Sequence, residues 1–226
     1  MQYTLNDIAK MIDHSLLNPT LNTDQLEQGI QAVIPYSVAS ICIVPYYLKR
    51  CVQLLEGSPI KSSTTIGFPH GVQTIAAKVD EAEQALRDGA QELDAVVNIS
   101  QVVSENWEYV RSELKAIIEI VHSNNQKVKI IFENCYLADP QKIKLCEICG
   151  GLNADWVKTS TGFGTSGATV QDVRLMRQHS PSHVQIKAAG GIRDLDSVLA
   201  FREAGATRIG TSRTIEILEQ CQKNRG

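Results

Sequence analysis

Residues 154–162 read ADWVKTSTG, a short apolar run that carries Lys158 and ends in a turn of small polar residues. Such a run, bounded by turn residues, is typical of a buried β-strand. It is one of eight short β-branched or apolar runs, each followed by a stretch suited to a helix. The predicted strands are residues 12–15, 38–44, 63–67, 92–98, 128–133, 155–159, 184–188 and 207–211.

Helix start and stop signals lie between the strands. Thr23 and Thr169 suit helix N-caps, and Pro45 and Pro140 suit first turns. Pattern alone predicts further helices at 73–87, 105–122, 195–203 and 214–222. A left-handed cap suits the glycines that follow three predicted helix ends, which are Gly89, Gly150 and Gly205.

Eight strands alternating with eight helices, without a linker or a break in composition, predict an α/β fold, a (β/α)8 TIM barrel. We expect residues 1–226 to form a single domain, with a short N-terminal helix at 4–11 closing the bottom of the barrel. An open doubly wound sheet is the competing fold. It would more naturally place G-x-G-x-x-G after its first strand, and the sequence has no such turn.

Composition excludes several classes of partner. The chain has 226 residues and a formal net charge of -3, so neither nucleic acid nor an anionic membrane is a favoured partner. No apolar run approaches the roughly 20 residues of a membrane helix, and the first residues do not resemble a signal peptide, so we expect a cytoplasmic protein. The six cysteines are expected to be reduced, and the single C-x-x-C pair, Cys146 and Cys149, is a weak indication of a metal or redox site.

Three charged residues lie within predicted strands: Asp94, Lys158 and Lys187. In a barrel they would converge on one lumen, where one carboxylate facing two lysines, together with burial, favours the neutral form of one amine. Lowering a lysine pKa of about 10.4 by about three units, worth about 4 kcal/mol, makes the free amine common at neutral pH. A Schiff-base nucleophile is then predicted. The alternative is a structural ion-pair cluster, or side chains that point outward between helices.

Glycine-rich turns follow the last two predicted strands. Gly190 and Gly191 follow residues 184–188, and Gly210 and Ser212 lie at the end of residues 207–211. Barrel enzymes often bind phosphate in these two loops through backbone N–H groups. We therefore expect a phosphate site there.

Nine segments, in order along the chain, resemble deoxyribose-phosphate aldolase: MIDHSLLNP, SICIVP, TTIGFPHG, ELDAVVNIS, KVKIIFENCYL, ADWVKTSTGF, GATVQDVRLM, IKAAGGIR and GATRIGTS. The resemblance implies a TIM-barrel class I aldolase, a lyase that needs no metal or other cofactor. It implies reversible cleavage of 2-deoxy-D-ribose 5-phosphate to D-glyceraldehyde 3-phosphate and acetaldehyde, in deoxyribonucleotide catabolism.

The resemblance also implies roles for single residues. Lys158 would form the Schiff base, Lys187 would perturb its pKa, and Asp94 would take part in proton transfer with a water. Asp13 would support the lysines; the alternative is that it only caps the first strand. The remaining positions are the pocket residues Ser15 and Cys42 and the phosphate-side residues Gly162, Gly190, Gly191, Gly210 and Ser212. Cys42 can instead be a small core residue, and His14 is more simply a hydrogen-bonded barrel residue than a ligand.

Three residues depart from the family pattern: Asn134, Phe163 and Arg213. Phe163 stands where some members carry a lysine, which weakens the charge available to a phosphate. Arg213 would either bind phosphate or turn into solvent, and Asn134 would alter contacts with the sugar hydroxyls.

Two other functions remain open at this point. Another Schiff-base aldolase or a transaldolase would keep the lysine but act on a ketose donor, and a non-catalytic sugar-phosphate-binding protein would not need a neutral Lys158. In each case the expected partner is a small-molecule sugar phosphate. A homodimer or a larger homo-oligomer is also expected, because barrel faces often pair.

Overall fold

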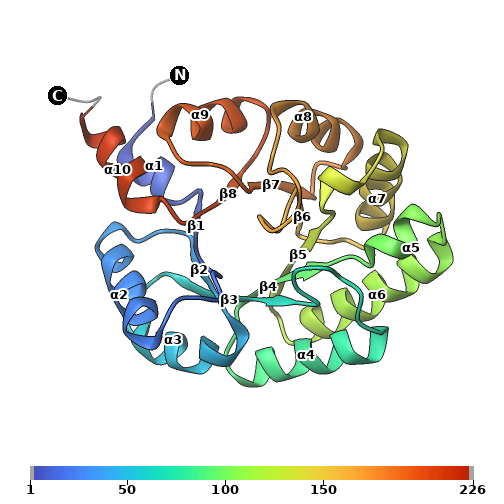
Figure 1. Ribbon diagram of the computed structural model, residues 1–226, viewed down its shortest axis with the longest axis horizontal. Coiled ribbons are helices and arrows are strands. Elements are labelled where there is room, and N and C mark those ends of the chain that lie inside the picture. The colour runs from blue at the N-terminus through green and yellow to red at the C-terminus, as the bar shows by residue number, and fades with distance from the viewer. Residues whose placement is uncertain (1–2, 224–226) are drawn as a thin grey trace.

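The computed structural model describes residues 3–223 and contains one closed barrel of parallel strands, joined in chain order from β1 to β8 and back to β1 (Figure 1). The strands are β1 (Ile12–Leu16), β2 (Ser40–Ile43), β3 (Lys61–Ile66), β4 (Glu92–Val96), β5 (Lys127–Ile131), β6 (Trp156–Lys158), β7 (Gln185–Ala189) and β8 (Arg208–Thr211). All eight predicted strands are present. The predicted TIM barrel is therefore confirmed.

Helices form a ring outside the barrel (Figure 1). They are α1 (Leu5–Ala9), α2 (Thr23–Val33), α3 (Leu48–Leu54), α4 (Ile75–Arg87), α5 (Ile99–Val103), α6 (Trp107–Ser123), α7 (Asp139–Gly151), α8 (Val170–His179), α9 (Leu195–Glu203) and α10 (Thr214–Lys223). The outer faces of the strands are apolar and pack on the helices. Helix α6, for example, buries Val110, Leu114, Ile117 and Val121 on one side, at the spacing of an amphipathic helix.

Some predicted helix boundaries are wrong. Asn22, not Thr23, caps α2, because its side-chain oxygen accepts from the backbone N–H of Gln25 at 2.9 Å. Gly150 lies inside α7 rather than after it, and Asn153 adopts the left-handed conformation beyond the helix end. A Cβ on Gly150 would lie 2.7 Å from Pro181 Cδ, so close packing is what requires glycine there.

The predicted N-terminal helix forms, but it does not close the barrel. Helix α1 lies in the outer ring and packs against α10 (Figure 1). The N-terminal end of the lumen is instead filled by side chains from the first residues of three strands: Glu92, Trp156 and Arg208. The Arg208 guanidinium carbon lies 4.8 Å from the Trp156 ring centroid, so a cation stacks on the aromatic face.

None of the helices among residues 3–223 is both long and apolar enough to span a membrane.

Candidate active site

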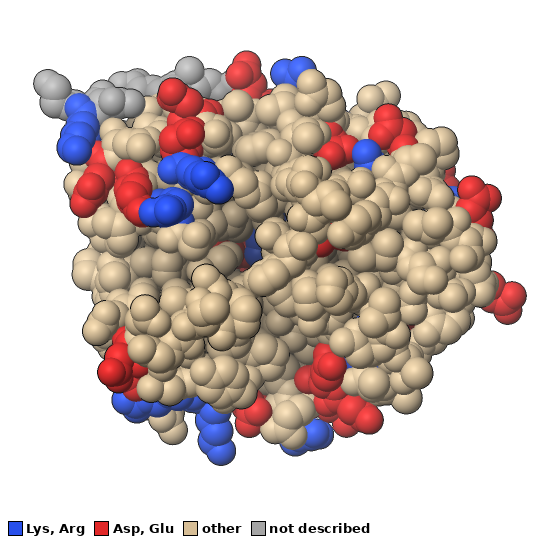
Figure 2. Space-filling view, viewed as in Figure 1, with Lys and Arg blue, Asp and Glu red and all other residues tan. Residues whose placement is uncertain are grey.

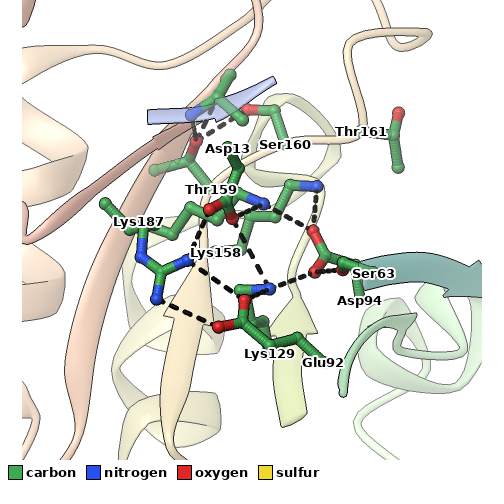
Figure 3. A network of polar contacts seen from close by, with 12 residues as sticks. Asp13, Ser63, Glu92, Asp94, Lys129, Lys158, Thr159, Ser160, Thr161 and Lys187 are labelled. Atoms are coloured by element: carbon green, nitrogen blue, oxygen red, sulfur yellow. Dashed lines mark hydrogen bonds and ion pairs between the residues drawn. The ribbon is translucent and has the colours of Figure 1, made fainter. Parts of the chain in front are cut away.

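The charged residues singled out in three strands meet inside the barrel. Lys158 ends β6 and Lys187 lies opposite it in the β6–β7 register, while Asp94 is the middle residue of β4. Both lysine ammonium groups donate to the same oxygen, Asp94 Oδ2, at 2.7 Å each (Figure 3). The structure therefore excludes the alternative in which these side chains point outward between helices.

Asp13 belongs to the same group. From β1, its Oδ2 lies 2.6 Å from Lys187 Nζ, and its Oδ1 accepts a hydrogen bond from Arg208. It therefore has a place among the lysines and does more than cap the first strand.

Two further cations belong to this cluster, Lys129 and Arg208, and neither they nor the role of Glu92 were predicted from the sequence. Lys129 of β5 lies 2.8 Å from Asp94 Oδ1 and 2.6 Å from Glu92 Oε2. Arg208 of β8 makes two contacts of 3.1 Å with the Glu92 carboxylate. Figure 3 shows Lys129 between Asp94 and Glu92, below Lys158. Lys129 lies within KVKII, and the register places it directly beside Asp94, so a charge in an apolar run was the available signal.

The charges in the lumen do not balance when all groups are ionised. Four cations, Lys129, Lys158, Lys187 and Arg208, face three carboxylates, Asp13, Glu92 and Asp94. One positive charge is left over. Because an uncompensated charge in a buried site is costly, the seven side chains together favour the loss of one proton from one of the cations.

The two lysines that share Asp94 have pKa values shifted in opposite directions. Burial is the largest influence on Lys158 and lowers its pKa below the usual 10.5, with Asp94 opposing and Lys187 adding to that decrease. Burial also lowers the pKa of Lys187, but Asp13 and Asp94 outweigh it and leave that pKa raised. Burial alone would raise the pKa of Asp94, yet the three neighbouring lysines hold it well below its usual range. Lys158 is therefore the amine that gives up its proton most readily.

Lys158 is also the lysine that meets a cavity. A cavity of about 870 Å³ is lined by Lys158 together with residues of the loops that follow β1, β6, β7 and β8. It includes the predicted positions Ser15, Gly162, Gly190, Gly191, Gly210 and Ser212. Seen along the barrel, the centre of the molecule is hollowed and its surrounding surface is largely uncharged (Figure 2). Asp94, Lys187, Asp13 and Cys42 lie beneath this surface rather than among the lining residues.

Glycine allows two of these loops to touch. Gly190 has a φ of 88°, which favours glycine, and a Cβ there would lie 2.9 Å from Gly167 Cα. The backbone after β7 therefore packs directly on the backbone after β6, which leaves main-chain groups at the cavity surface.

Glu133 fixes the loop after β6 and was not predicted. It is buried, has a φ of 56°, and its Oε1 accepts from the backbone N–H of Thr161 at 3.2 Å. The Thr161 hydroxyl also donates to this carboxylate. The loop that carries Gly162 is thus tied to the end of β5.

The minor candidates have defined surroundings. Cys42 is buried, and burial raises the pKa of its thiol to about 11, so it is a neutral neighbour of the lysines. His14 lies at 2.8 Å from the Thr214 hydroxyl, which confirms a hydrogen-bonded barrel residue. Cys146 and Cys149 are both buried in α7, and residues 3–223 contain no group of three or more potential metal ligands drawn from His, Cys, Asp and Glu.

The three departures from the family pattern are also placed. Phe163 lines the cavity and packs edge-on against Phe68 with ring centroids 5.4 Å apart. Arg213 lines it too, but its guanidinium pairs with Glu216 at 2.9 Å. Asn134 is buried, and its amide nitrogen lies 3.3 Å from the sulfur of Met176, away from the cavity-lining residues.

Comparison with known proteins identifies the family of the chain. Residues 8–216 match the model of the DeoC/LacD family aldolases. A deoxyribose-phosphate aldolase of Rhodopirellula baltica is 59% identical over 99% of this chain and 93% of its own length, and one of Streptococcus mutans is 46% identical over 97% and 99%. The structure of the tetrameric deoxyribose phosphate aldolase of Aeropyrum pernix superposes with a TM-score of 0.90 at 30% identity, over 98% of this chain and 93% of that one. A barrel with a buried lysine next to its cavity, and similarity along nearly the whole sequence, lead to one conclusion: the chain belongs to the DeoC/LacD family of aldolases.

Proposed function

We propose that Lys158 is the amine that forms the Schiff base when this aldolase cleaves 2-deoxy-D-ribose 5-phosphate to D-glyceraldehyde 3-phosphate and acetaldehyde. The observation that carries the proposal is the surplus cation in the lumen. Of the four cations there, Lys158 combines a lowered pKa with a position on the cavity wall. A buried lysine beside another cation is an established route to a reactive amine.

The chemistry follows from a free amine at this position. Lys158 Nζ attacks the C1 aldehyde of the open-chain sugar, and loss of water gives a protonated imine. A base removes the proton of the C3 hydroxyl, and the C2–C3 bond breaks because the two-carbon product keeps C1 and C2. The electron pair moves into the imine and gives an enamine, while C3 becomes the aldehyde of glyceraldehyde 3-phosphate. Protonation and hydrolysis of the enamine then release acetaldehyde and restore the amine.

Asp94 and Lys187 form a hydrogen-bonded relay beside Lys158. The raised pKa of Lys187 keeps that amine protonated, whereas the lowered pKa of Lys158 favours loss of its proton to a water. Asp94 Oδ2 lies 2.7 Å from each amine, so it connects the ammonium of Lys187 to the reacting nitrogen. We infer that Lys187 donates a proton, by way of Asp94 and a water, when the carbinolamine loses its hydroxyl as water, and that it is reprotonated from solvent.

We assign the phosphate to the far side of the cavity. The loop after β7 supplies the backbone of Gly190 and Gly191, and the loop after β6 supplies that of Gly162. Gly210 lies near the end of β8, and Ser212 follows that strand. Backbone N–H groups suit an oxyanion. Holding the phosphate there would place the sugar carbonyl over Lys158, so that binding energy contributes to positioning.

The proposal is tested by trapping the imine. Borohydride with acetaldehyde should add one ethyl group to the native protein, on the peptide that contains Lys158. The adduct should be lost in Lys158→Ala and kept in the matched control Lys144→Ala, which removes an exposed lysine paired with Glu147. An adduct that persists on another residue in Lys158→Ala contradicts the assignment.

The same experiment separates the alternatives. A ketose-specific aldolase or transaldolase would trap dihydroxyacetone phosphate in preference to acetaldehyde. A non-catalytic binding protein would bind the sugar phosphate and form no adduct.

We further propose that the whole chain acts as one aldolase domain in the cytoplasm, as a homo-oligomer. A phosphorylated substrate and six cysteines that form no disulfide, all within residues 3–223, support the cytoplasm. The tetrameric assembly named for the Aeropyrum pernix enzyme supports an oligomer. Light scattering of the purified chain should give a mass of at least two subunits, and a monomer at all concentrations would contradict this.

A further inference from the structure

The charged groups of the lumen form a closed ring. Following the contacts from Asp94, the ring runs through Lys129 (2.8 Å), Glu92 (2.6 Å), Arg208 (3.1 Å), Asp13 and Lys187 (2.6 Å), and returns to Asp94 (2.7 Å). Positive and negative groups alternate around it, so the ring is neutral by itself. Lys158 is attached to it only through Asp94, as the fourth cation.

Two members of the ring lie far from the reacting groups. Glu92 is the first residue of β4 and Arg208 the first of β8, so both lie at the N-terminal end of the lumen. Neither lines the cavity, and the ring of Trp156 stacks on Arg208. They cannot touch a substrate bound at Lys158, and the chemistry proposed above makes no direct use of them.

The two residues nevertheless share ion-pair partners with Asp94 and Lys187. Glu92 shares Lys129 with Asp94, and Arg208 shares Asp13 with Lys187. A lysine that pairs with a second carboxylate depends less on its ion pair with Asp94. The contacts of Glu92 and Arg208 therefore reach Lys158 through Lys129 on one side, and through Asp13 and Lys187 on the other.

We propose that Glu92 and Arg208 are positioning residues that set how readily Lys158 releases its proton, with opposite effects. The inference deepens the proposed function and rests on Lys158 as the nucleophile. Without Glu92, Lys129 would pair more strongly with Asp94. Asp94 would then stabilise the protonated form of Lys158 less, and Lys158 would lose its proton more readily. Without Arg208, Asp13 would be free to satisfy Lys187, and Asp94 would hold the proton on Lys158 more firmly.

The other groups that act on Lys158 do not change the sign of either effect on its proton release. The influences on it come from Asp94 of β4, Lys187 of β7 and the thiol of Cys42 of β2. Cys42 stays neutral because burial raises its pKa to about 11. Lys129 of β5 and Asp13 of β1 act through Asp94 and Lys187, and Ser63 of β3, at 3.5 Å from Asp94 Oδ1, is uncharged.

The test measures the yield of ethyl adduct trapped in a short, fixed time as a function of pH. Its midpoint is the pH at which this yield reaches half of its maximum. We expect Glu92→Gln to move this midpoint down by about one pH unit and Arg208→Gln to move it up by a similar amount, as expected for charges at this range in a protein interior. The double variant Glu92→Gln/Arg208→Gln restores the charge balance and should return the midpoint to within about half a unit of the native value. Circular dichroism and a thermal melt establish that each variant is folded.

Shifts in the same direction, or none in folded variants, would overturn the inference. If a single variant does not fold, Glu92→Asp and Arg208→Lys keep the charge but shorten its reach, and they should give smaller shifts with the same two signs. Equal midpoints in that pair would overturn it too. Peptide mapping of the native adduct keeps the two proposals apart: an adduct elsewhere than Lys158 refutes the proposed function, whereas an adduct on Lys158 with unmoved midpoints refutes this inference alone.

Discussion

Lys158 and Lys187 occupy paired positions on β6 and β7 and donate to one and the same oxygen, Asp94 Oδ2. Two ammonium groups on one carboxylate oxygen repel each other, and the second carboxylate, Asp13, is closer to Lys187 than to any other lysine of the cluster. The proton is therefore held by Lys187 and given up by Lys158. Substitutions that change the charges around these two amines should therefore change the reactivity of Lys158.

Lys187→Met should raise the pKa of Lys158, because it removes a repelling cation and leaves Asp94 Oδ2 to Lys158 alone. Each unit of that increase lowers the fraction of free amine at neutral pH about tenfold. The pH profile of kcat/KM should move to higher pH, with a loss of at least about tenfold at pH 7. An unmoved profile in the folded variant would show that Lys187 has no electrostatic effect on the amine.

Asp94→Asn should separate imine formation from turnover. The amide keeps the shape but takes away the negative charge, so Lys158 remains deprotonated and acetaldehyde should still be trapped. Cleavage of the sugar phosphate should fall by about 100-fold or more, the usual cost of losing a proton-transfer group. Equal losses of trapping and cleavage would contradict a role for Asp94 in proton transfer.

The stability of the barrel should fall in acid because of the lumen carboxylates. Burial would raise the pKa values of Asp13 and Asp94, but the neighbouring cations outweigh it and lower both below 3.8. Carboxyl groups whose folded pKa is depressed contribute stability that is present above the unfolded pKa and is lost as pH falls through the folded value. The free energy of unfolding in urea should therefore begin to decline near pH 4 and continue downward, and Asp13→Asn should flatten that decline. The exposed control Asp196→Asn should leave it unchanged.

A second buried ion pair supports the loops of the catalytic face. Lys78 of α4 lies 2.8 Å from Glu113 of α6, both fully buried, and it also donates to the carbonyls of Gly71 and Val96. Glu113 in turn accepts from the backbone N–H of Asn98. Breaking a buried pair by removing one partner costs about 3–5 kcal/mol. Lys78→Met should lower the unfolding free energy by that amount, measured by denaturant titration.

The matched control for this pair is exposed. Lys115→Met removes a surface lysine that lies 3.7 Å from Glu119 on α6, and it should cost at most about 1 kcal/mol. Similar losses in the two variants would contradict a special role for the buried pair.

Phe163→Lys should improve recognition of the phosphate. Phe163 lines the cavity near Gly162 and presents no charge to a phosphate. An exposed ion pair contributes about 0.2–1 kcal/mol, so KM for 2-deoxy-D-ribose 5-phosphate should fall by up to about fivefold. The control Phe163→Leu should bring no such gain, and KM for unphosphorylated deoxyribose should not change. An equal decrease for both sugars would show that the effect is not one of charge.

The sequence predicts the barrel well because each strand is a short β-branched or apolar run that is followed by a stretch suited to a helix, so local patterns suffice. It also brings Lys158, Asp94 and Lys187 together, because period-two alternation places each on the inner face of its strand. Lys129 has a local signal, a charge in the apolar run KVKII, which was overlooked. The partners of Lys129 and Arg208 could not be predicted, because they depend on the register between strands and on which charges share a layer of the lumen. No local pattern specifies those partners. The Lys78–Glu113 pair is missed for the same reason, since two helices must be packed before a buried lysine can be matched with its acid.

The most direct test is the pKa of Lys158 itself. It can be followed by NMR of lysine Cε across the pH range, with the resonance assigned by its absence in Lys158→Arg. The account predicts a midpoint clearly below the usual lysine value of 10.5, with Lys187 titrating above it. A midpoint for Lys158 at or above that value would mean that the amine is cationic at neutral pH, and that the barrel holds no nucleophile.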